Sequence, residues 1–238
     1  MAINGLPVYL RDYKMSILAG FHVEGNDYLI LRAFTAKILQ LPEEKIKVDP
    51  IDPSGRGWAF ILNSVSNALH RFYGQCAQFA VIGVDNDGNI DLDANDLTED
   101  PSHPRHSNHP DQRVAECRYC QLEDVVTKVR PRLSWLPKKP GHTWPILIAV
   151  PVELIETWLL LCQGNLDAQK KPRSIQKQQL YGKPTPTRDD IENVAIPLIR
   201  SMTPDDVAAL ANASPSFRDF HDQLINNQTA ICGPTDCW

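Results

Sequence analysis

Short apolar runs separated by longer amphipathic segments dominate the first two thirds of the chain. Three runs are nearly unbroken, as in strands that are buried on both faces of a parallel sheet, and a fourth segment alternates as a shorter strand does. We therefore predict strands at residues 15–23, 45–51, 79–84 and 145–150. Apolar residues at helical spacing predict helices at residues 27–41, 58–73, 112–129 and 152–162.

Strands and helices that alternate in this way predict an α/β fold of the Rossmann-like kind, with a mainly parallel sheet and helices on both faces. Ligands of such sheets bind beyond the carboxyl ends of the strands. We assign residues 14–162 to this core, with a polar insertion at about residues 88–142 that carries His and Cys residues.

The rest of the chain, residues 163–238, is predicted to be a C-terminal extension that packs on the core. Residues 163–188 are polar, basic and interrupted by prolines, which indicates an exposed loop. Short helices are expected at residues 189–200, 204–212 and 216–226, and Thr203 and Ser214 are suitable caps for the last two.

The composition excludes several classes of protein. The chain has 238 residues, of which 42% are hydrophobic and 22% are charged, and this balance excludes disorder, collagen and coiled coil. A formal net charge of −5 gives no overall basic surface for coating nucleic acid. The charge is unevenly divided, however, because residues 125–184 contain ten Lys and Arg against three Asp and Glu, which leaves −12 for the remainder. A local basic edge is therefore compatible with the negative total.

Cysteine content and hydropathy bear on the compartment. Six cysteines are too few for a disulfide scaffold, and residues 1–13 lack the pattern of a signal peptide. The longest apolar stretch, residues 146–162, is interrupted by Pro151, Glu153 and Glu156, and carboxylates are costly inside a membrane span. We therefore expect a cytoplasmic protein without a membrane partner.

Acidic residues follow two of the predicted strands. Glu24 comes directly after the first strand, and Asp85 and Asp87 come directly after the third. Carboxylates that converge at one sheet edge repel one another unless a cation lies between them, and such hard oxygen ligands select Mg²⁺ or Mn²⁺. The alternative is that the Asp-Asn-Asp-Gly sequence at residues 85–88 is only a capped turn.

A calcium loop beginning at Asp85 is a weaker interpretation of the same residues. Alternating Asp and Asn side chains are typical of such loops, but Ile90 and Asp96 stand where an EF-hand loop requires Gly and Glu.

The order of these motifs resembles the TOPRIM fold, which topoisomerases, primases and the overcoming-lysogenization-defect nucleases share. The resemblance covers about residues 14–162, with Glu24 after one strand, Asp85 and Asp87 after another, and Glu153 and Glu156 after the last. Residues 150–161 (VPVELIETWLLL) are also similar to small standalone TOPRIM-like proteins of bacterial defence systems and mobile elements.

This resemblance implies roles for individual residues. Glu24 would be a general acid/base or a metal ligand, Asp85 and Asp87 would bind Mg²⁺, and Glu156, together with Glu153, would add a ligand as in the nuclease branch. The family often has an aspartate four residues after the glutamate. Here Tyr28 occupies that position and Asp27 precedes it, so the resemblance assigns no clear role to Asp27.

The predicted insertion contains a second group of metal-ligand residue types, which begins at His103. Imidazole and thiolate are the tetrahedral ligands of zinc, so the group is a candidate structural Zn²⁺ site. Its four candidate ligands are His106, His109, Cys117 and Cys120. The alternative is that the two cysteines lie on one helix face and pack as small apolar residues, because a single Cys-x-x-Cys pair does not specify zinc.

Basic residues beside the acidic motifs are candidate contacts to nucleic acid, because cations neutralise backbone phosphates. They are Lys138, Lys139, Lys170, Lys171 and Arg173. A solvated lysine-rich loop is the alternative interpretation, and it is equally consistent with the residues after 169.

Three functional hypotheses follow. The first is a Mg²⁺- or Mn²⁺-dependent phosphodiesterase or nuclease that acts on DNA or RNA in bacterial anti-phage defence, with Glu24, Asp85, Asp87 and Glu156 as catalytic residues. The second is a non-catalytic TOPRIM-like partner or regulatory subunit of an ATPase-containing complex, in which the ATPase is a separate protein because this chain contains no P-loop. The third is a phosphotransfer or hydrolysis enzyme that uses the same acids on small molecules.

Overall fold

The computed structural model describes residues 16–50, 57–85, 118–133, 144–151 and 154–232. Its centre is a four-stranded sheet in the order β2-β1-β3-β4, in which all neighbouring strands are parallel. The strands are β1 (Ile17–His22), β2 (Ile46–Pro50), β3 (Phe79–Gly83) and β4 (Ile146–Ala149). Every residue of β3 and β4 is buried, as expected from their unbroken apolar sequences.

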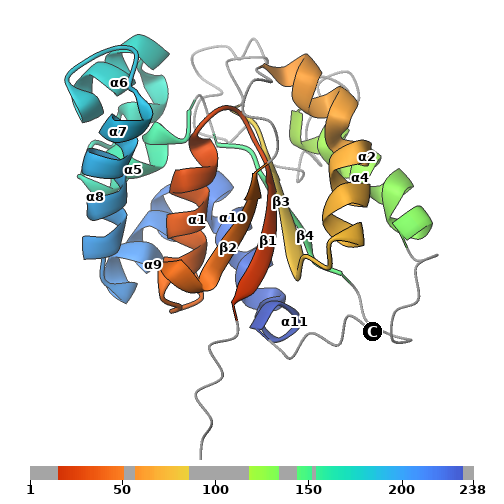
Figure 1. The fold of residues 1–238 in the computed structure, drawn as a ribbon. Coiled ribbons are helices and arrows are strands. Elements are labelled where there is room, and N and C mark those ends of the chain that lie inside the picture. Colours follow the sequence, from red (N-terminus) through yellow and green to blue (C-terminus); the bar gives the residue numbers. More distant parts are fainter. Residues whose placement is uncertain (1–15, 51–56, 86–117, 134–143, 152–153, 233–238) are drawn as a thin grey trace, which may run out of the picture.

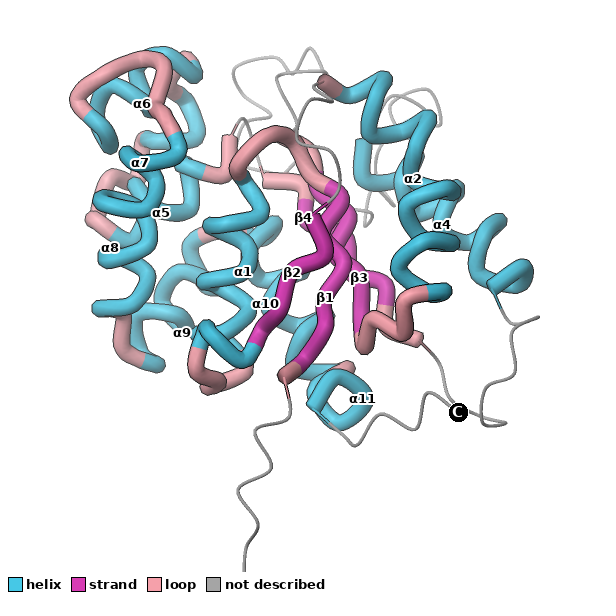
Figure 2. Tube along the Cα trace, in the orientation of Figure 1, coloured by secondary structure: helices cyan, strands magenta, loops and turns pink. Residues whose placement is uncertain are grey.

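Helices cover both faces of the sheet (Figure 1, Figure 2), so the predicted α/β class with a parallel sheet is confirmed. One face is covered by α2 (Trp58–Gly74) and α4 (Arg118–Leu133). The other is covered by α1 (Asp27–Ile38), α5 (Glu156–Cys162) and C-terminal helices. Successive strand residues alternate between these two hydrophobic clusters because the side-chain period of a strand is two.

The order of the strands defines where a site can form. From β1 the chain passes through α1 to β2 on one side, and then returns through α2 to β3 on the other side of β1. Ligands of parallel sheets bind beyond the carboxyl ends of two such neighbouring strands, where the direction of winding reverses. Glu24 lies two residues after β1 and Asp85 lies two residues after β3, so the topology brings both to this end of the sheet.

The end of β1 is held firmly against α2. A Cβ atom at Gly20 would lie 2.2 Å from Cγ of Phe72, so only glycine lets this ring lie against the strand. On the same face, Nε2 of His22 is 3.2 Å from the carbonyl oxygen of Ile61 and 3.0 Å from Oγ of Ser64. Burial lowers the pKa of His22, which favours the neutral ring. These contacts fix the point from which Glu24 follows.

A short 3₁₀ turn, η1 (Glu43–Lys45), precedes β2.

The C-terminal region is more helical than its sequence pattern predicted. The elements after α5 are η2 (Ala168–Lys170), α6 (Arg173–Tyr181), α7 (Arg188–Asp190), the π-helix η3 (Ile191–Ala195), α8 (Ile196–Ser201), α9 (Pro204–Ala213), α10 (Pro215–Asn226) and α11 (Gln228–Cys232). The predicted caps are confirmed, since Thr203 and Ser214 accept hydrogen bonds from backbone N–H groups in the first turns of α9 and α10.

The expectation of one exposed loop over residues 163–188 is wrong, because this segment contains η2 and α6. Pro172 and Gly182 interrupted the pattern, yet they bracket α6: Pro172 is its amino-terminal cap, and Gly182 ends it with a φ of 72°. Only Gln176 and Leu180 of this helix are buried. An apolar face this small does not produce a visible periodicity.

Helix α10 attaches the C-terminal region to the edge of the sheet. The side-chain amide of Gln223 accepts from the N–H of Ile148 and donates to its carbonyl oxygen, each at 2.9 Å. Because β4 is an edge strand, this amide takes the place that a neighbouring strand would occupy. Phe217 and Phe220 of α10 also pack on Trp158, with ring centroids 5.2 and 6.0 Å away.

Candidate acidic site at the carboxyl ends of the strands

Four carboxylates from separate parts of the chain interact electrostatically at the carboxyl end of the sheet. Glu24 follows β1, Asp27 begins α1, Asp85 follows β3, and Glu156 begins α5. Burial raises the pKa of Asp85, and the negative charges of Asp27, Glu156 and Glu24 all raise it further. We call these four residues the acidic cluster. It contains three of the carboxylates named from the sequence and adds Asp27.

Asp85 is the best-fixed member of the acidic cluster. Its side chain is only 5% exposed. One carboxylate oxygen accepts from the backbone N–H of Ile155 at 3.1 Å, and the other accepts from Nη2 of Arg173 at 3.0 Å. Its backbone carbonyl accepts from the guanidinium of Arg118, which also lies over the Trp58 ring. Since Ile155 directly precedes Glu156, the contact to its N–H also holds the start of α5 beside the end of β3.

Burial is the main electrostatic cost in the acidic cluster. It raises the pKa of Asp85 and Asp27 well above the usual range, and it raises the pKa of Glu156 as well. Repulsion by neighbouring carboxylates adds to the effect at Asp85 and Asp27, whereas Arg173 opposes it. Burial and repulsion of this kind favour either protonation of a carboxylate or a cation beside it.

The cations that oppose this cost come from one face of α6. Arg173, Lys177 and Tyr181 are spaced four residues apart, so they lie on the same side of the helix. Nζ of Lys177 is 3.9 Å from Oε1 of Glu156, whose side chain is 4% exposed. Burial raises the pKa of Tyr181, and the negative charge of Glu156 raises it further. The acidic cluster therefore faces two cations and a phenol.

Polar contacts dock α6 on α5. Oγ1 of Thr157 on α5 donates to Oε1 of Gln176 on α6 at 2.6 Å. Nε2 of Gln176 donates to the carbonyl of Lys171 at 2.9 Å, which ties α6 to the segment just before it. Gln176 is fully buried and Leu180 is nearly so. These contacts hold α6 independently of its ion pairs with the acidic cluster.

The carboxylates of the acidic cluster have the right chemistry for Mg²⁺ or Mn²⁺, which prefer hard oxygen ligands. Within the described part of the chain, however, no three Asp, Glu, His or Cys side chains are arranged so that they could hold a metal ion. Both oxygens of Asp85 already accept hydrogen bonds, and Glu156 faces Lys177. Arg173 and Lys177 thus provide positive charge at the position where a divalent cation would provide it.

Several residues predicted from the sequence lie outside the described residues. They are Asp87, Glu153, His103, His106, His109, Cys117, Lys138 and Lys139. Of the four candidate zinc ligands only Cys120 is described, as a half-buried cysteine on α4. The zinc site therefore stays a prediction.

The three described candidates for nucleic-acid contact have different surroundings. Lys170 is exposed and lies 3.8 Å from Asp167, and Lys171 donates to Oδ1 of Asn165 at 3.0 Å. Arg173 instead contacts Asp85, so it belongs to the acidic cluster's surroundings more than to an open basic surface.

Two kinds of residue were missed or left unassigned by the sequence analysis. Asp27 lacked a role because it is one residue before the position that the family pattern favours. Lys177 and Tyr181 were missed because their four-residue spacing from Arg173 has meaning only in a helix, and the segment was expected to be a loop.

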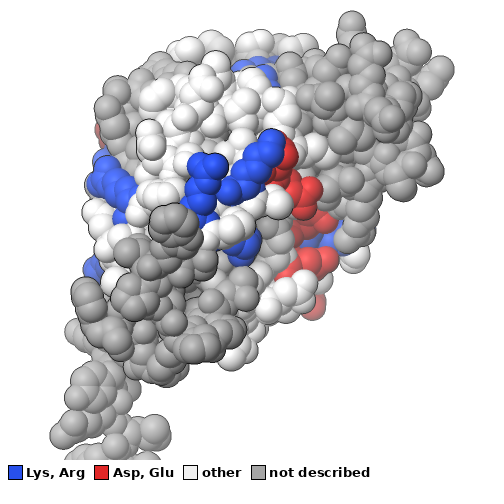
Figure 3. Space-filling view, turned by 90° about the vertical axis from the view of Figure 1, so that its right-hand side faces the viewer, with Lys and Arg blue, Asp and Glu red and all other residues white. Residues whose placement is uncertain are grey.

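Among the described residues of the face over α2 and α4, the basic side chains do not form a continuous surface. Figure 3 shows Lys and Arg side chains there next to a row of Asp and Glu side chains. On α4 the exposed residues of both signs include Asp124 and Lys128, which form an ion pair at 2.5 Å. The electrostatic character of this face is mixed.

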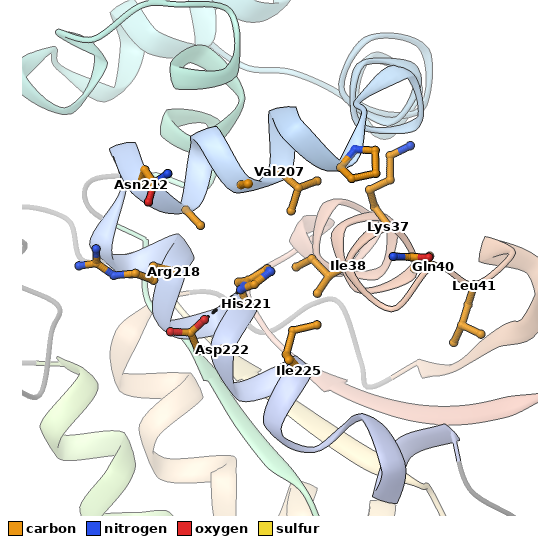
Figure 4. A pocket seen from close by; sticks show the side chains of 14 residues that line it. Lys37, Ile38, Gln40, Leu41, Val207, Asn212, Arg218, His221, Asp222 and Ile225 are labelled. Carbon is orange, nitrogen blue, oxygen red and sulfur yellow. Dashed lines mark hydrogen bonds and ion pairs between the residues drawn. The ribbon is translucent and has the colours of Figure 1, made fainter.

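A pocket of about 660 Å³ lies between α1, α9 and α10 (Figure 4). Its lining is largely apolar, with Ile38, Val207 and Ile225 among its residues. His221 points into it, and Nδ1 of this histidine is 3.0 Å from Oδ1 of Asp222. The pocket adjoins the carboxyl-terminal end of α1, whereas Asp27 is at the other end, so it is separate from the acidic cluster.

Comparison of the chain with protein-family models, with curated proteins and with solved structures finds no match in any of the three. The TOPRIM-like family thus stays a prediction from short motifs and their order. In the described ranges no helix is both long enough and apolar enough to cross a membrane.

Proposed function

We propose that this protein is a TOPRIM-like phosphodiesterase that cleaves DNA or RNA with the help of Mg²⁺ or Mn²⁺. The observation that carries the proposal is the convergence of Glu24, Asp27, Asp85 and Glu156 at the topological switch point of a parallel sheet. Burial raises the pKa values of Asp27, Asp85 and Glu156, and repulsion by neighbouring carboxylates raises those of Asp27 and Asp85 further. Perturbed carboxylates that gather in this position are typical of functional sites. The motif resemblance supports the same chemistry.

Each residue has a distinct task in this proposal. Asp85 and Glu156 would hold the metal among the described residues, and Asp87 would be a further ligand. A bound Mg²⁺ or Mn²⁺ ion would neutralise the scissile phosphate and orient the attacking water. Glu24 accepts a proton from that water as its oxygen bonds to phosphorus and the bond to the leaving oxygen breaks. The leaving oxygen is protonated from solvent.

The test uses single- and double-stranded DNA and RNA oligonucleotides with Mg²⁺ or Mn²⁺. We expect the wild type to cleave at least one of them and the double variant Asp85→Ala/Asp87→Ala to be inactive. Glu24→Gln keeps size and polarity, so it serves as the second inactive variant if the double variant unfolds. The matched control is Asp124→Asn, which removes an exposed carboxylate from α4. Metal-dependent cleavage retained in both cluster variants would contradict the proposal.

One observation favours the second function, a non-catalytic partner or regulatory subunit of an ATPase complex. A buried carboxylate cluster without a catalytic metal must be neutralised by cations of the protein itself. The ion pairs of Arg173 with Asp85 and of Lys177 with Glu156 supply such cations. Under this alternative, a pulldown recovers an ATPase, and the purified protein cleaves none of the oligonucleotides in either metal.

A further inference from the structure

The pocket between α1, α9 and α10 has the features of a small-molecule site. Its volume of about 660 Å³ lies within the range of known ligand pockets, about 300–1,000 Å³. Such pockets combine a mostly apolar lining with a few polar groups that orient the ligand. None of the residues that line it belongs to the acidic cluster, so the proposed function does not use this pocket.

Contacts that need no ligand fix the three walls of the pocket. Helix α1 ends in a tight turn, in which Gln40 has a φ of 54° and the N–H of Leu41 donates to the carbonyl oxygen of Ala36 at 2.9 Å. Helix α9 begins at the cap formed by Thr203, and α10 is attached to β4 through Gln223. A site that is formed before the ligand arrives loses little conformational entropy on binding.

The middle of the pocket is apolar. Figure 4 shows Ile38, Val207 and Ile225 around the same space, one from each of the three helices. Ile225 is 42% exposed although it is large and apolar. A ligand with an apolar body would remove this side chain from water, which is favourable in proportion to the area that is buried.

The two ends of the pocket differ in polarity. Leu41 lies at one end in Figure 4, whereas Asn212 and Arg218 lie at the other. These two polar residues are near each other because they stand on either side of the turn between α9 and α10. The half-buried Arg218 side chain makes no ion pair or hydrogen bond with any residue that the structure describes. Its guanidinium is therefore available to a ligand at the rim.

The charges of the lining favour a ligand with one negative charge. Lys37 and Arg218 are positive and Asp222 is negative, which gives a formal charge of +1 when His221 is neutral. Nδ1 of His221 faces Asp222 at 3.0 Å, so Nε2 is the ring nitrogen that is left for the pocket. A carboxylate carries one charge and fits the planar fork of a guanidinium with two parallel hydrogen bonds.

We propose that this pocket binds a small monocarboxylate with an apolar body, of the medium-chain fatty acid class. The apolar body lies against Ile38, Val207 and Ile225, and the carboxylate accepts hydrogen bonds from Arg218. His221 positions the carboxylate end through Nε2. This binding site is independent of the proposed cleavage activity, because the two sites share no residue.

The experiment is calorimetric titration of the full chain with octanoate in a metal-free buffer. Two comparison ligands separate the parts of the molecule: 1-octanol has the apolar body without the charge, and acetate has the charge without the apolar body. We expect octanoate to bind at one site per chain, about tenfold or more tighter than 1-octanol, because a hydrogen bond to a charged group is stronger than one to a neutral group. Acetate should give no measurable binding.

Three variants locate the ligand. Arg218→Gln should weaken octanoate binding about tenfold and leave 1-octanol binding unchanged. The matched control is Arg132→Gln, which removes an exposed arginine from α4 and should bind both ligands as the wild type does. Ala208→Trp places an indole in the pocket from an exposed position of α9, so it should abolish binding of both ligands. Circular dichroism and thermal unfolding establish that each variant is folded, and Arg218→Gln tests the inference if Ala208→Trp is not.

Three results would overturn the inference: no saturable binding of octanoate, equal affinity for octanoate and 1-octanol, or an unchanged octanoate affinity in folded Arg218→Gln. Light scattering adds a fourth. If the wild type is a dimer that Ala208→Trp converts to a monomer and octanoate does not bind, the pocket is an interface between two copies of the chain. Oligonucleotide cleavage by Ala208→Trp should equal that of the wild type, so failure of this site and failure of the proposed function are distinguishable.

Discussion

The acidic cluster and the outer surface of α4 both pair carboxylates with cations, but their surroundings differ. Asp124 and Lys128 on α4 are 2.5 Å apart, with side chains 58% and 70% exposed. Lys177 and Glu156 are farther apart, at 3.9 Å, but the glutamate is only 4% exposed. Water screens the first pair and is largely excluded from the second. Burial, more than distance, therefore decides which carboxylates affect stability and chemistry.

The largest expected effect of this difference is on cleavage. If the protein is the proposed phosphodiesterase, Asp85→Asn should reduce metal-dependent cleavage at least about 100-fold, because it would remove a charged metal ligand, whereas Asp124→Asn should leave the rate unchanged. Rates are measured on the best oligonucleotide substrate at saturating Mn²⁺. Equal rates for the two variants would remove the functional distinction between the two regions.

If the acidic cluster binds Mn²⁺ as proposed, the metal should stabilise the folded protein through this cluster and not through the outer surface of α4. At a Mn²⁺ concentration of about 100 times the dissociation constant, the wild type should gain about 2.7 kcal/mol, or about 5–10 °C in Tm. The measurement is thermal unfolding with Mn²⁺ and with EDTA. Asp124→Asn should retain the gain and Asp85→Asn should lose most of it. A gain that persists in Asp85→Asn would place the metal elsewhere.

The pH dependence of stability has a definite sign in the metal-free protein. The folded-state pKa values of Asp27, Asp85 and Glu156 are raised, so the folded chain binds more protons than the unfolded chain between the ordinary and the raised values. Their contribution to stability is present in full at low pH and is lost as the pH rises through the folded pKa values. The slope is at most about 1.4 kcal/mol per pH unit for each proton.

Urea unfolding in EDTA at several pH values from 5 to 7 measures this slope. His22 opposes the trend below its ordinary pKa, because burial lowers its pKa in the folded state and the unfolded chain then binds the extra proton. The double variant Asp85→Asn/Glu156→Gln keeps His22, so the difference between its curve and the wild-type curve isolates the acidic cluster. A difference that does not change with pH would show that these carboxylates are not perturbed.

The smallest expected effects come from the lysines, and they test the comparison most directly. Lys177→Gln should destabilise the protein by about 1–2 kcal/mol at neutral pH, because it leaves the buried Glu156 without its nearest cation, although the partial exposure of Lys177 reduces the cost. Lys128→Gln should cost less than about 0.5 kcal/mol despite its shorter ion pair. Urea unfolding of both variants measures these costs. The reverse order would mean that distance outweighs burial.

The strands and the convergence of Glu24 with Asp85 could be predicted from the sequence for a simple reason. Apolar runs mark strands that are buried on both faces, and polar residues just after such strands must lie at one edge of a parallel sheet. Glu156 followed from the same logic, since it comes after β4 and begins α5.

The surroundings of the acidic cluster could not be predicted in the same way. Helix α6 is held by the buried amide of Gln176 and by Leu180, and neither a polar contact nor a single apolar side chain leaves a periodic signal. The sequence pattern therefore predicts only that Arg173 contacts nucleic acid or lies in a solvated loop, and it predicts no separate role for Lys177. The position of Asp27 in the cluster depends on where α1 begins, and helix ends are the least certain feature of a sequence pattern.

The contact between Gln223 and Ile148 has a consequence for self-association. An edge strand with open N–H and C=O groups can recruit a strand from a second chain, and this is a common start of aggregation. At Ile148 both groups are already used by an amide from α10. Widening the sheet at this position would require α10 to leave, with Phe217 and Phe220 leaving their places beside Trp158. A residue 75 positions further along the chain thus links protection of the sheet edge to completion of the C-terminal fold.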